Sequence, residues 1–336
     1  ALNAVFLFHR RGPTNYNNRR VGKPMTRCGE KPYDVVIATY NGELFLPAQL
    51  ESILGQSAPP HAIYIRDDGS TDGTVAVIRN YAAKFSNIIH VAGDGRLGYI
   101  KNFEALVRHC TSPIVFFSDQ DDVWKPWKAA EIVAAFQSDG SPDCVYSNAM
   151  IVDEELAPIS ALIDPNMQSS ASLADLLKSS TVTGATMACN TRFLHEACVP
   201  FDGDVPHDYW IAFHAARRGS LKYLPAMLTL YRQHGGNQIG ARRQWVMQRA
   251  ARALTNDGFR KRRKTQYYRH KLFSELSPDD PSAKENLDGI SLLDAIYGTA
   301  DGVISLSGVA HVARSFGPYS LLFAVDWLLA RRARIT

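Results

Sequence analysis

The sequence predicts an α/β domain with a mostly parallel central sheet, and two observations support this fold class. From residue 33 onward, short apolar runs alternate with stretches that have the periodicity of amphipathic helices. Alternation of this kind is typical of parallel sheets that helices cover on both faces. The chain has 336 residues, of which 46 % are hydrophobic and 21 % are charged, so a packed core is expected and global disorder is excluded.

The expected elements follow one another in order along the chain. We expect strands at residues 33–39, 61–66, 87–92 and 113–118, and helices at residues 43–55, 72–84, 99–110 and 126–137. This organisation predicts three parts: a basic, disordered extension at residues 1–31, an α/β domain at residues 32–240, and a basic helical region at residues 241–336.

The composition favours a cytoplasmic protein. Its five cysteines are an odd number without a CxxC pair, which is typical of unpaired thiols in a reducing compartment and disfavours a disulfide framework or a zinc site. No run of the sequence reaches the ~18 uncharged apolar residues of a membrane-spanning helix.

The C-terminal region carries a separate signal. Between residues 242 and 271 the chain is rich in arginine and lysine with Asp257 as its lone acid, and residues 319–330 are almost wholly apolar and are followed by arginines. An apolar helix flanked by arginines suits an anionic membrane surface, so we expect peripheral association with the inner face of the cytoplasmic membrane. The alternative is that residues 321–329 pack as a core or dimer helix. Nucleic acid is excluded as a partner, because aromatic residues are few in the basic stretch and no binding motif occurs.

Polar side chains gather where three of the expected strands end. Because the carboxyl ends of parallel strands lie at one rim of a sheet, we expect these side chains to meet there. They are Thr39, Tyr40 and Asn41 after the first strand, Asp67 and Asp68 after the second, and Asp119, Gln120, Asp121 and Asp122 after the fourth. Like charges in a cluster repel unless a cation compensates them, and hard divalent cations prefer oxygen ligands. The acidic cluster after the fourth strand therefore predicts a divalent metal, Mg²⁺ or Mn²⁺, whereas Asp72 is more simply interpreted as a helix N-cap.

A competing signal lies at residues 93–98, which form a formal GxGxxG between a strand and a helix. Asp119 follows about 21 residues later, at the spacing of a dinucleotide-binding fingerprint. However, the glycines follow the third strand rather than the first, and an acidic cluster stands where ribose recognition needs one carboxylate. We therefore interpret residues 93–98 as a loop, and a dinucleotide-binding oxidoreductase is the minor alternative.

Taken together, the motifs resemble the family 2 glycosyltransferases of GT-A fold. The matching segments are residues 36–42, 67–72, 118–124, 146–148, 183–187, 207–210 and 231–234. The run SDQDDVW at residues 118–124, with KNFE at residues 101–104, is most similar to the rhamnosyltransferase branch that builds bacterial surface polysaccharides. Arg96 departs from the family pattern, which has asparagine at this position.

The resemblance implies a role for each matching residue. The residues that it places around the donor nucleotide are Thr39, Tyr40, Asn41, Asp67, Asp68, Lys101 and Asp119. It makes Asp121 a metal ligand, and His234 a second metal ligand or a contact to the diphosphate. Asp208 would be the general base, against the alternative that it is only the N-cap of the helix that follows.

The implied reaction is a single displacement that inverts the anomeric carbon. The donor would be a nucleotide-diphosphate sugar, by the branch resemblance dTDP-rhamnose, and the acceptor a hydroxyl of a growing, lipid-linked surface polysaccharide. A divalent ion would stabilise the charge on the leaving diphosphate while Asp208 takes the acceptor proton. The alternative from another class is an inactive membrane-surface binding module of the same fold.

Overall fold

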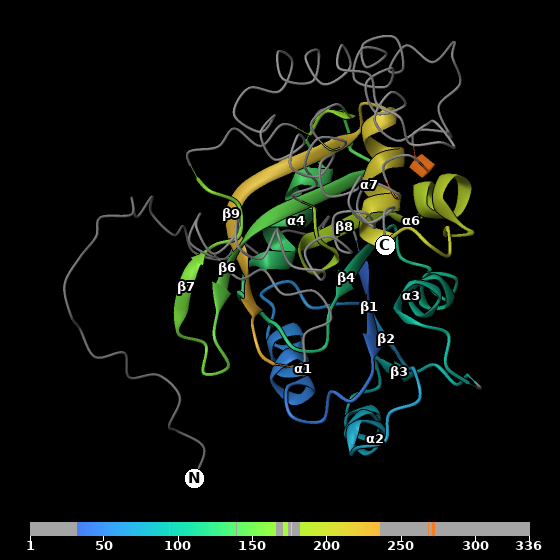
Figure 1. Ribbon diagram of the computed structural model, residues 1–336, viewed down its shortest axis with the longest axis vertical. Helices are drawn as coiled ribbons and strands as arrows, with labels where there is room; N and C mark the ends of the chain where they lie inside the picture. Colours follow the sequence, from blue (N-terminus) through green and yellow to red (C-terminus); the bar gives the residue numbers. More distant parts are fainter. Residues whose placement is uncertain are drawn as a thin grey trace, which may run out of the picture. The chain divides into compact units, whose positions relative to one another are not determined.

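The computed structural model describes residues 32–93, 95–138, 140–165, 171–173, 176, 182–235, 268 and 271–272 (Figure 1). The expected extension at residues 1–31 and the expected membrane-surface helix at residues 319–330 lie outside the described residues. Of the expected basic helical region, the structure describes Tyr268, Lys271 and Leu272. Within this described part of the chain, no helix is both long enough and apolar enough to cross a bilayer.

The first half of the sheet is parallel, as the alternation of elements predicts. β1 (Tyr33–Thr39) pairs with β2 (Ala62–Asp67) on one side and with β4 (Ile114–Ser118) on the other, and β2 pairs with β3 (Ile88–His90). The helices of this half are α1 (Leu46–Leu54), α2 (Thr74–Lys84), α3 (Tyr99–Val107) and α4 (Lys128–Phe136). Each strand and helix expected between residues 33 and 137 is confirmed, with its ends shifted by at most a few residues.

Beyond β4 the sheet becomes mixed and curls. β8 (Met187–Asn190) lies antiparallel to β4, and β6 (Cys144–Val152) lies antiparallel to β8. The long β9 (Leu221–Arg232) runs parallel to β6 (Figure 1). Near its end it pairs with the short β5 (Val123–Trp124). β7 (Pro158–Ala161) forms a hairpin with β6, and the strand order is β3-β2-β1-β4-β8-β6-β9-β5. The sheet is therefore parallel from β3 to β4 and between β6 and β9, and antiparallel elsewhere.

The short helical turn η1 (Gly184–Thr186) leads directly into β8. After β8, the short segments α6 (Thr191–Phe193) and η2 (Leu194–Cys198) lead to the helix α7 (His207–Arg217).

Two hydrophobic cores cover the two faces of the sheet. Along β1, Val36 packs into one core with α3 and α7, whereas Val35 and Ile37 pack into the other with α1 and α4. Alternate residues of a strand point to opposite faces, and all three of these side chains are fully buried. Burial on both faces explains why the sequence of β1 is a continuous apolar run.

The parallel register brings the carboxyl ends of β1, β2 and β4 to one rim. Thr39, the last residue of β1, is paired with Asp67, the last residue of β2. Ser118 ends β4 beside Ile37 of β1, two residues before the end of β1. The polar clusters after these strands therefore begin side by side.

At the opposite end of β1, a buried carboxylate holds the loop before β4. Asp34 is fully buried, and its oxygens accept hydrogen bonds from the backbone N–H groups of Thr111 and Ser112, both at 2.9 Å. The hydroxyl of Ser112 donates to the same carboxylate at 2.7 Å, and Nδ1 of His61 lies 3.1 Å from it. Because buried donors lose free energy when their acceptor is removed, Asp34 anchors this loop.

We expect Asp34→Ala to lower the free energy of unfolding by roughly 2–4 kcal/mol, because each buried N–H left without an acceptor costs about 1–3 kcal/mol. Urea unfolding followed by circular dichroism measures the change. Asp153→Ala is the matched control, since the Asp153 carboxylate accepts exposed hydrogen bonds in the turn before β7 and water can replace it. Equal stability of the two variants would contradict the anchoring role of Asp34.

Candidate active site

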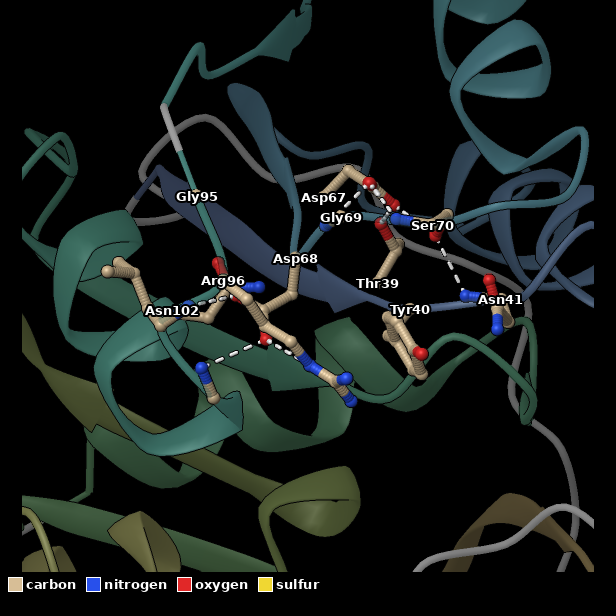
Figure 2. Close-up of polar contacts among 12 residues, drawn as sticks. Thr39, Tyr40, Asn41, Asp67, Asp68, Gly69, Ser70, Gly95, Arg96 and Asn102 are labelled. Atoms are coloured by element: carbon tan, nitrogen blue, oxygen red, sulfur yellow. Dashed lines mark hydrogen bonds and ion pairs between the residues drawn. The ribbon is translucent and has the colours of Figure 1, made fainter.

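The loops after β1 and β2 are held together by Asp67 (Figure 2). Its Oδ2 accepts hydrogen bonds from the backbone N–H groups of Gly69 at 3.0 Å and Ser70 at 2.7 Å. Its Oδ1 accepts from the hydroxyls of Thr39 at 3.0 Å and Ser70 at 2.5 Å. Thr39 and Asp67, both predicted to contact the nucleotide, are therefore in contact with each other, and their contact with a nucleotide stays a prediction.

Asn41 closes the same pair of loops from the β1 side. Its backbone is left-handed, with a φ of 49°, a conformation that asparagine tolerates better than most residues. Its N–H donates to the Ser70 hydroxyl at 2.8 Å, and its side-chain oxygen accepts from the N–H of Thr71 at 2.9 Å. Asp72 lies one residue before the N-cap of α2 rather than at it, and accepts from the N–H of Thr74 at 3.0 Å. These hydrogen bonds join the loop after β1 to the loop after β2.

Asp68 is buried behind this loop and fixes the segment that leads into α3. Its Oδ1 accepts from the N–H of Leu97 at 2.6 Å, and its Oδ2 accepts from the N–H of Gly98 at 2.9 Å. The buried Arg66 donates to Asp68 at 3.4 Å and to the carbonyl of Gly95 at 3.2 Å. These contacts explain the glycine-rich run as a loop tied to β2. A direct contact between Asp68 and the nucleotide stays a prediction.

Two side chains without a role in the sequence prediction meet Tyr40. The guanidinium of Arg96 lies 4.0 Å from the centroid of the Tyr40 ring (Figure 2), and its Nε is 3.9 Å from Asp68. Gln120 Oε1 accepts from the Tyr40 N–H at 2.9 Å, and its Nε2 donates to the Tyr40 carbonyl at 3.0 Å. Gln120 thus joins the loop after β4 to the loop after β1. The sequence signal for the Gln120 contact was its place after the fourth expected strand, and the signal for Arg96 was its departure from the family pattern.

Lys101, predicted to lie near the nucleotide, has other partners within the chain. Its Nζ donates to Glu104 at 2.7 Å and to the carbonyl of Phe201 at 2.6 Å. It therefore links α3 to the segment before α7, and its place beside a nucleotide stays a prediction.

The acidic loop after β4 meets the end of β9. Oδ2 of Asp121 lies 2.9 Å from Nε2 of His234, and both side chains are largely buried. Arg232, the last residue of β9, donates its backbone N–H to Asp122 at 2.9 Å and its Nε to the carbonyl of Asp121 at 2.8 Å. The two predicted metal ligands, Asp121 and His234, are thus brought together across 113 positions of sequence.

The ring of Phe45 packs against the ring of His234. The two rings pack with their centroids 4.5 Å apart, and the guanidinium of Arg232 lies 4.8 Å from the Phe45 ring. Because Phe45 directly precedes α1, this packing relates the orientation of His234 to the loop after β1.

Crowding changes the proton affinity of the acidic loop. Burial, together with the charges of Asp121 and Asp208, raises the pKa of Asp119 to about 7. Burial and the neighbouring carboxylates also raise the pKa of Asp122 well above its usual range. The ammonium of Lys128 is fully buried, and burial lowers its pKa to about 7 against the opposing pull of the aspartates. The carboxylates therefore destabilise one another's charge, which is a situation that a bound cation relieves.

Asp208 lies in the first turn of α7, and the N-cap of this helix is Pro206, so the N-cap alternative for Asp208 is wrong. Its Oδ1 accepts from the N–H of Tyr209 at 2.8 Å, and its Oδ2 accepts from the N–H of Gly184 in η1 at 3.2 Å. The helix dipole favours a carboxylate at this end of the helix. Two backbone donors therefore orient the predicted base.

The pKa values of two tyrosines are raised both by Asp208 and by carboxylates of the acidic loop. Burial raises the pKa of Tyr99 above its usual range, and the charges of Asp208 and Asp119 add to this shift. The pKa of Tyr231, in β9, is raised by burial, by the carboxylates of the acidic loop and by Asp208. The predicted base Asp208 and the predicted metal ligand Asp121 therefore both raise the pKa of Tyr231.

Comparison with known proteins assigns the chain to a family. The family model described as Glycosyl transferase family 2 matches residues 34–221, which is more than half of the chain. The chain belongs to this family. The match includes Asp121 and Asp208 and ends where β9 begins, before His234. The resemblance drawn from the motifs is thus confirmed.

Individual glycosyltransferases share the sequence or the fold. The dTDP-rhamnosyl transferase RfbG of Shigella flexneri is 28 % identical over 61 % of this chain and 74 % of that protein. S. aureus TarS in complex with UDP-GlcNAc has a TM-score of 0.52 at 14 % identity, over 88 % of this chain and 89 % of that chain. This chain spans 54 % of a longer TarS structure.

A second solved structure is similar along most of its length. The mannosyltransferase PcManGT from Pyrobaculum calidifontis, in complex with GDP-Man and Mn²⁺, has a TM-score of 0.54 at 18 % identity, over 93 % of this chain and 81 % of that chain. These similarities establish the GT-A fold of the family 2 enzyme described here and give the oxidoreductase alternative no support.

Helix α7, which carries Asp208, contains two histidines with lowered pKa values. Burial lowers the pKa of His207, although the charge of Asp208 opposes this shift. Burial and the charges of Arg217 and Arg218 lower the pKa of His214 from 6.5 to about 4. Below about pH 6.5 the unfolded chain therefore binds protons that the folded helix does not, and acid destabilises the fold.

We expect His214→Gln to lose less stability than the wild type when the pH falls from about 7 to about 5. In the wild type, the unfolded state protonates His214 below pH 6.5 and the folded state only near pH 4, so stability rises with pH across this window. Glutamine does not titrate and removes this contribution. Thermal unfolding at both pH values measures it, with His195→Gln at an exposed position of η2 as the control. An unchanged pH response of His214→Gln would show that burial does not keep this imidazole neutral.

Proposed function

We propose that this family 2 glycosyltransferase is metal-dependent and inverting, and that its donor is a nucleotide-diphosphate sugar. One observation carries the proposal. Asp121 lies 2.9 Å from His234, and the charges of Asp121 and Asp208, which come from different elements, both raise the pKa of one buried tyrosine, Tyr231. A cation-holding pair and a basic carboxylate at one rim are what a leaving diphosphate and an incoming hydroxyl require.

Rhamnose is the sugar that we propose, carried as dTDP-rhamnose. The support is the name of the similar Shigella protein, a dTDP-rhamnosyl transferase, together with the SDQDDVW run at residues 118–124. The solved structures with this fold hold UDP-GlcNAc or GDP-Man, which makes these nucleotide sugars the rival donors in a test.

The nucleotide would bind against the loops after β1 and β2. Thr39, Asn41 and Asp67 shape this surface, and Asp119 borders it from the end of β4. The ring of Tyr40 and the guanidinium of Arg96, which is largely exposed, would add a stacking surface and a positive charge for the diphosphate. Asp68 would act next to this surface by holding the backbone of Leu97 and Gly98, and Lys101 by linking α3 to Phe201.

The residues at the rim fit a divalent ion. Asp121 and His234 supply an oxygen and a nitrogen donor 2.9 Å apart, and among the described residues no three acidic, histidine or cysteine side chains form a metal-binding group. Two protein donors suit an ion whose remaining ligands are phosphate oxygens and water. Beside them, Oδ2 of Asp122 is buried and accepts no hydrogen bond from the described residues. When bound, the ion would stabilise the charge that develops on the leaving diphosphate.

Asp208 would take the proton from the acceptor hydroxyl. The N–H groups of Gly184 and Tyr209 fix its two oxygens, so the carboxylate is oriented before the acceptor arrives. A neutral hydroxyl is a poor nucleophile, and a positioned general base contributes a rate factor of about 10²–10⁴. Attack from the face opposite the leaving group inverts the anomeric carbon in one displacement, so no enzyme nucleophile is needed.

The acceptor that we propose is a hydroxyl of a growing, lipid-linked surface polysaccharide at the cytoplasmic face of the membrane. The support is the resemblance to the rhamnosyltransferase branch and the arginine-rich composition of residues 242–271, which suits an anionic lipid surface.

A donor panel tests the proposal and its metal. We expect release of nucleoside diphosphate from dTDP-rhamnose with Mn²⁺, at least about ten-fold faster than from UDP-hexoses or GDP-mannose, and none in EDTA. Asp121→Ala should abolish this release and weaken Mn²⁺ binding in calorimetry with dTDP, because it removes a metal ligand. Asp204→Ala, which removes a largely exposed carboxylate paired with Lys271, is the control. Full activity of Asp121→Ala, or of the wild type in excess EDTA, would rule out the metal assignment.

For Asp208→Asn we expect donor affinity within a few-fold of wild type and turnover lower by roughly 10²–10⁴, the contribution of a general base. Steady-state kinetics and dTDP binding separate the two quantities. Asp143→Asn is the matched control, since Asp143 pairs with Arg218 just beyond the other end of α7 at 3.0 Å. A large loss of donor binding with turnover preserved would mean that Asp208 is a nucleotide ligand instead.

A further inference from the structure

The turn η1 touches the proposed base at one residue and a buried cation at the next. The N–H of Gly184 donates to Oδ2 of Asp208 at 3.2 Å. The carbonyl of Ala185 accepts from the buried ammonium of Lys128 at 2.7 Å. The same ammonium donates to the hydroxyl of Thr229 in β9 at 3.0 Å. The turn is therefore anchored to α4 and β9 while its first N–H reaches Asp208.

The ring of His207 fills the space beside Gly184. His207 is 4 % exposed, and neither of its ring nitrogens has a hydrogen-bond partner among the described residues. Its ring packs against those of Phe103, Phe117 and Tyr99, with centroid distances of 4.3, 5.5 and 6.0 Å. Because burial lowers its pKa, the imidazole is neutral at physiological pH, and its contribution at this position is the space that the ring fills.

Position 184 has no room for a side chain. A Cβ on Gly184 would lie 2.6 Å from Nε2 and 3.2 Å from Cε1 of His207, closer than carbon atoms approach without displacement. The ring cannot swing away at low cost, because three aromatic side chains enclose it. The turn would therefore have to shift, and the N–H of Gly184 would move relative to Asp208.

We propose that Gly184 and His207 together position the general base. The ring of His207 sets where Gly184 lies, and the N–H of Gly184 then fixes the carboxylate of Asp208 for attack on the acceptor proton. This inference rests on the proposed role of Asp208. Both are positioning residues, since neither touches a reacting atom. The proposal also accounts for a buried imidazole that forms no hydrogen bond with the described residues, because only the packing surface of the ring is used.

Second-site rescue tests the proposal. The assay is hydrolysis of dTDP-rhamnose in Mn²⁺, with water as the acceptor. Gly184→Ala should lower kcat by about 10- to 100-fold, the range expected when a catalytic group is misplaced, while the donor KM stays within about three-fold. Gly203→Ala is the matched control, since a Cβ there meets nothing closer than Lys101 Cε at 3.8 Å. In a His207→Ala background, which vacates the space, the same change at Gly184 should alter kcat by less than about two-fold.

The proposal is wrong if Gly184→Ala turns over as fast as Gly203→Ala. It is equally wrong if Gly184→Ala lowers kcat by the same factor with and without His207, or if the loss appears in the donor KM alone, which would make Gly184 a donor contact. If Gly184→Ala does not fold, the double variant decides, because it must then fold and turn over within about two-fold of the His207→Ala single variant. Failure of the proposed function is distinguishable, since Asp208→Asn would then turn over normally.

Discussion

Three carboxylates follow β4 within four residues, and their burial at the rim is the constraint on which the rest of the site depends. A buried carboxylate is unfavourable unless donors or a cation compensate it. Here the compensating groups come from distant parts of the chain: the backbone of Arg232 and the imidazole of His234 from the end of β9, and the ammonium of Lys128 from α4. β9 reaches the rim because its pairing with β6 carries it across the sheet. The mixed half of the sheet therefore determines how the acidic loop is held.

The two sides of the rim differ in how their charge is satisfied. On the β2 side, Asp67 accepts hydrogen bonds from the N–H groups of Gly69 and Ser70, so the loop supplies its own donors. On the β4 side, burial and mutual repulsion raise the pKa values of Asp119 and Asp122. The loop after β2, whose carboxylate is already satisfied by backbone donors, suits a surface against which a nucleotide binds. The loop after β4, whose carboxylates destabilise one another's charge, suits a site that binds a cation.

One buried ammonium connects the two chemical halves of the proposed mechanism. Lys128 offsets the charge of Asp119 and Asp122, and it also donates to the carbonyl of Ala185, next to the N–H that holds Asp208. Lys128 therefore contacts the turn that holds Asp208 and also lies within the electrostatic influence of the acidic loop. Because a buried lysine with two hydrogen bonds has little freedom to move, the same contact limits how far the turn η1 can shift.

Local patterns in the sequence determined the first half of the fold and the composition of the site. The alternation of apolar runs and helical periods predicts β1 to β4 with their helices, because these patterns depend on residues close in sequence. The polar residues Thr39, Asp67 and Asp119 follow these strands directly, so a parallel sheet brings them to one rim whatever the rest of the chain does.

Only the tertiary structure decided which of these residues contact one another. The contacts between Gln120 and Tyr40 and between Asp121 and His234 join residues 80 and 113 positions apart, and no local period encodes such pairings. Asp68 is next to Asp67 in sequence, yet it turns to the backbone of Leu97 and Gly98 because successive side chains at the end of a strand point to opposite sides. The fit of the His207 ring against Gly184 likewise depends on the packing of α7 on the sheet. The sequence alone thus predicted which residues form the candidate site, and long-range packing determined which of them contact one another.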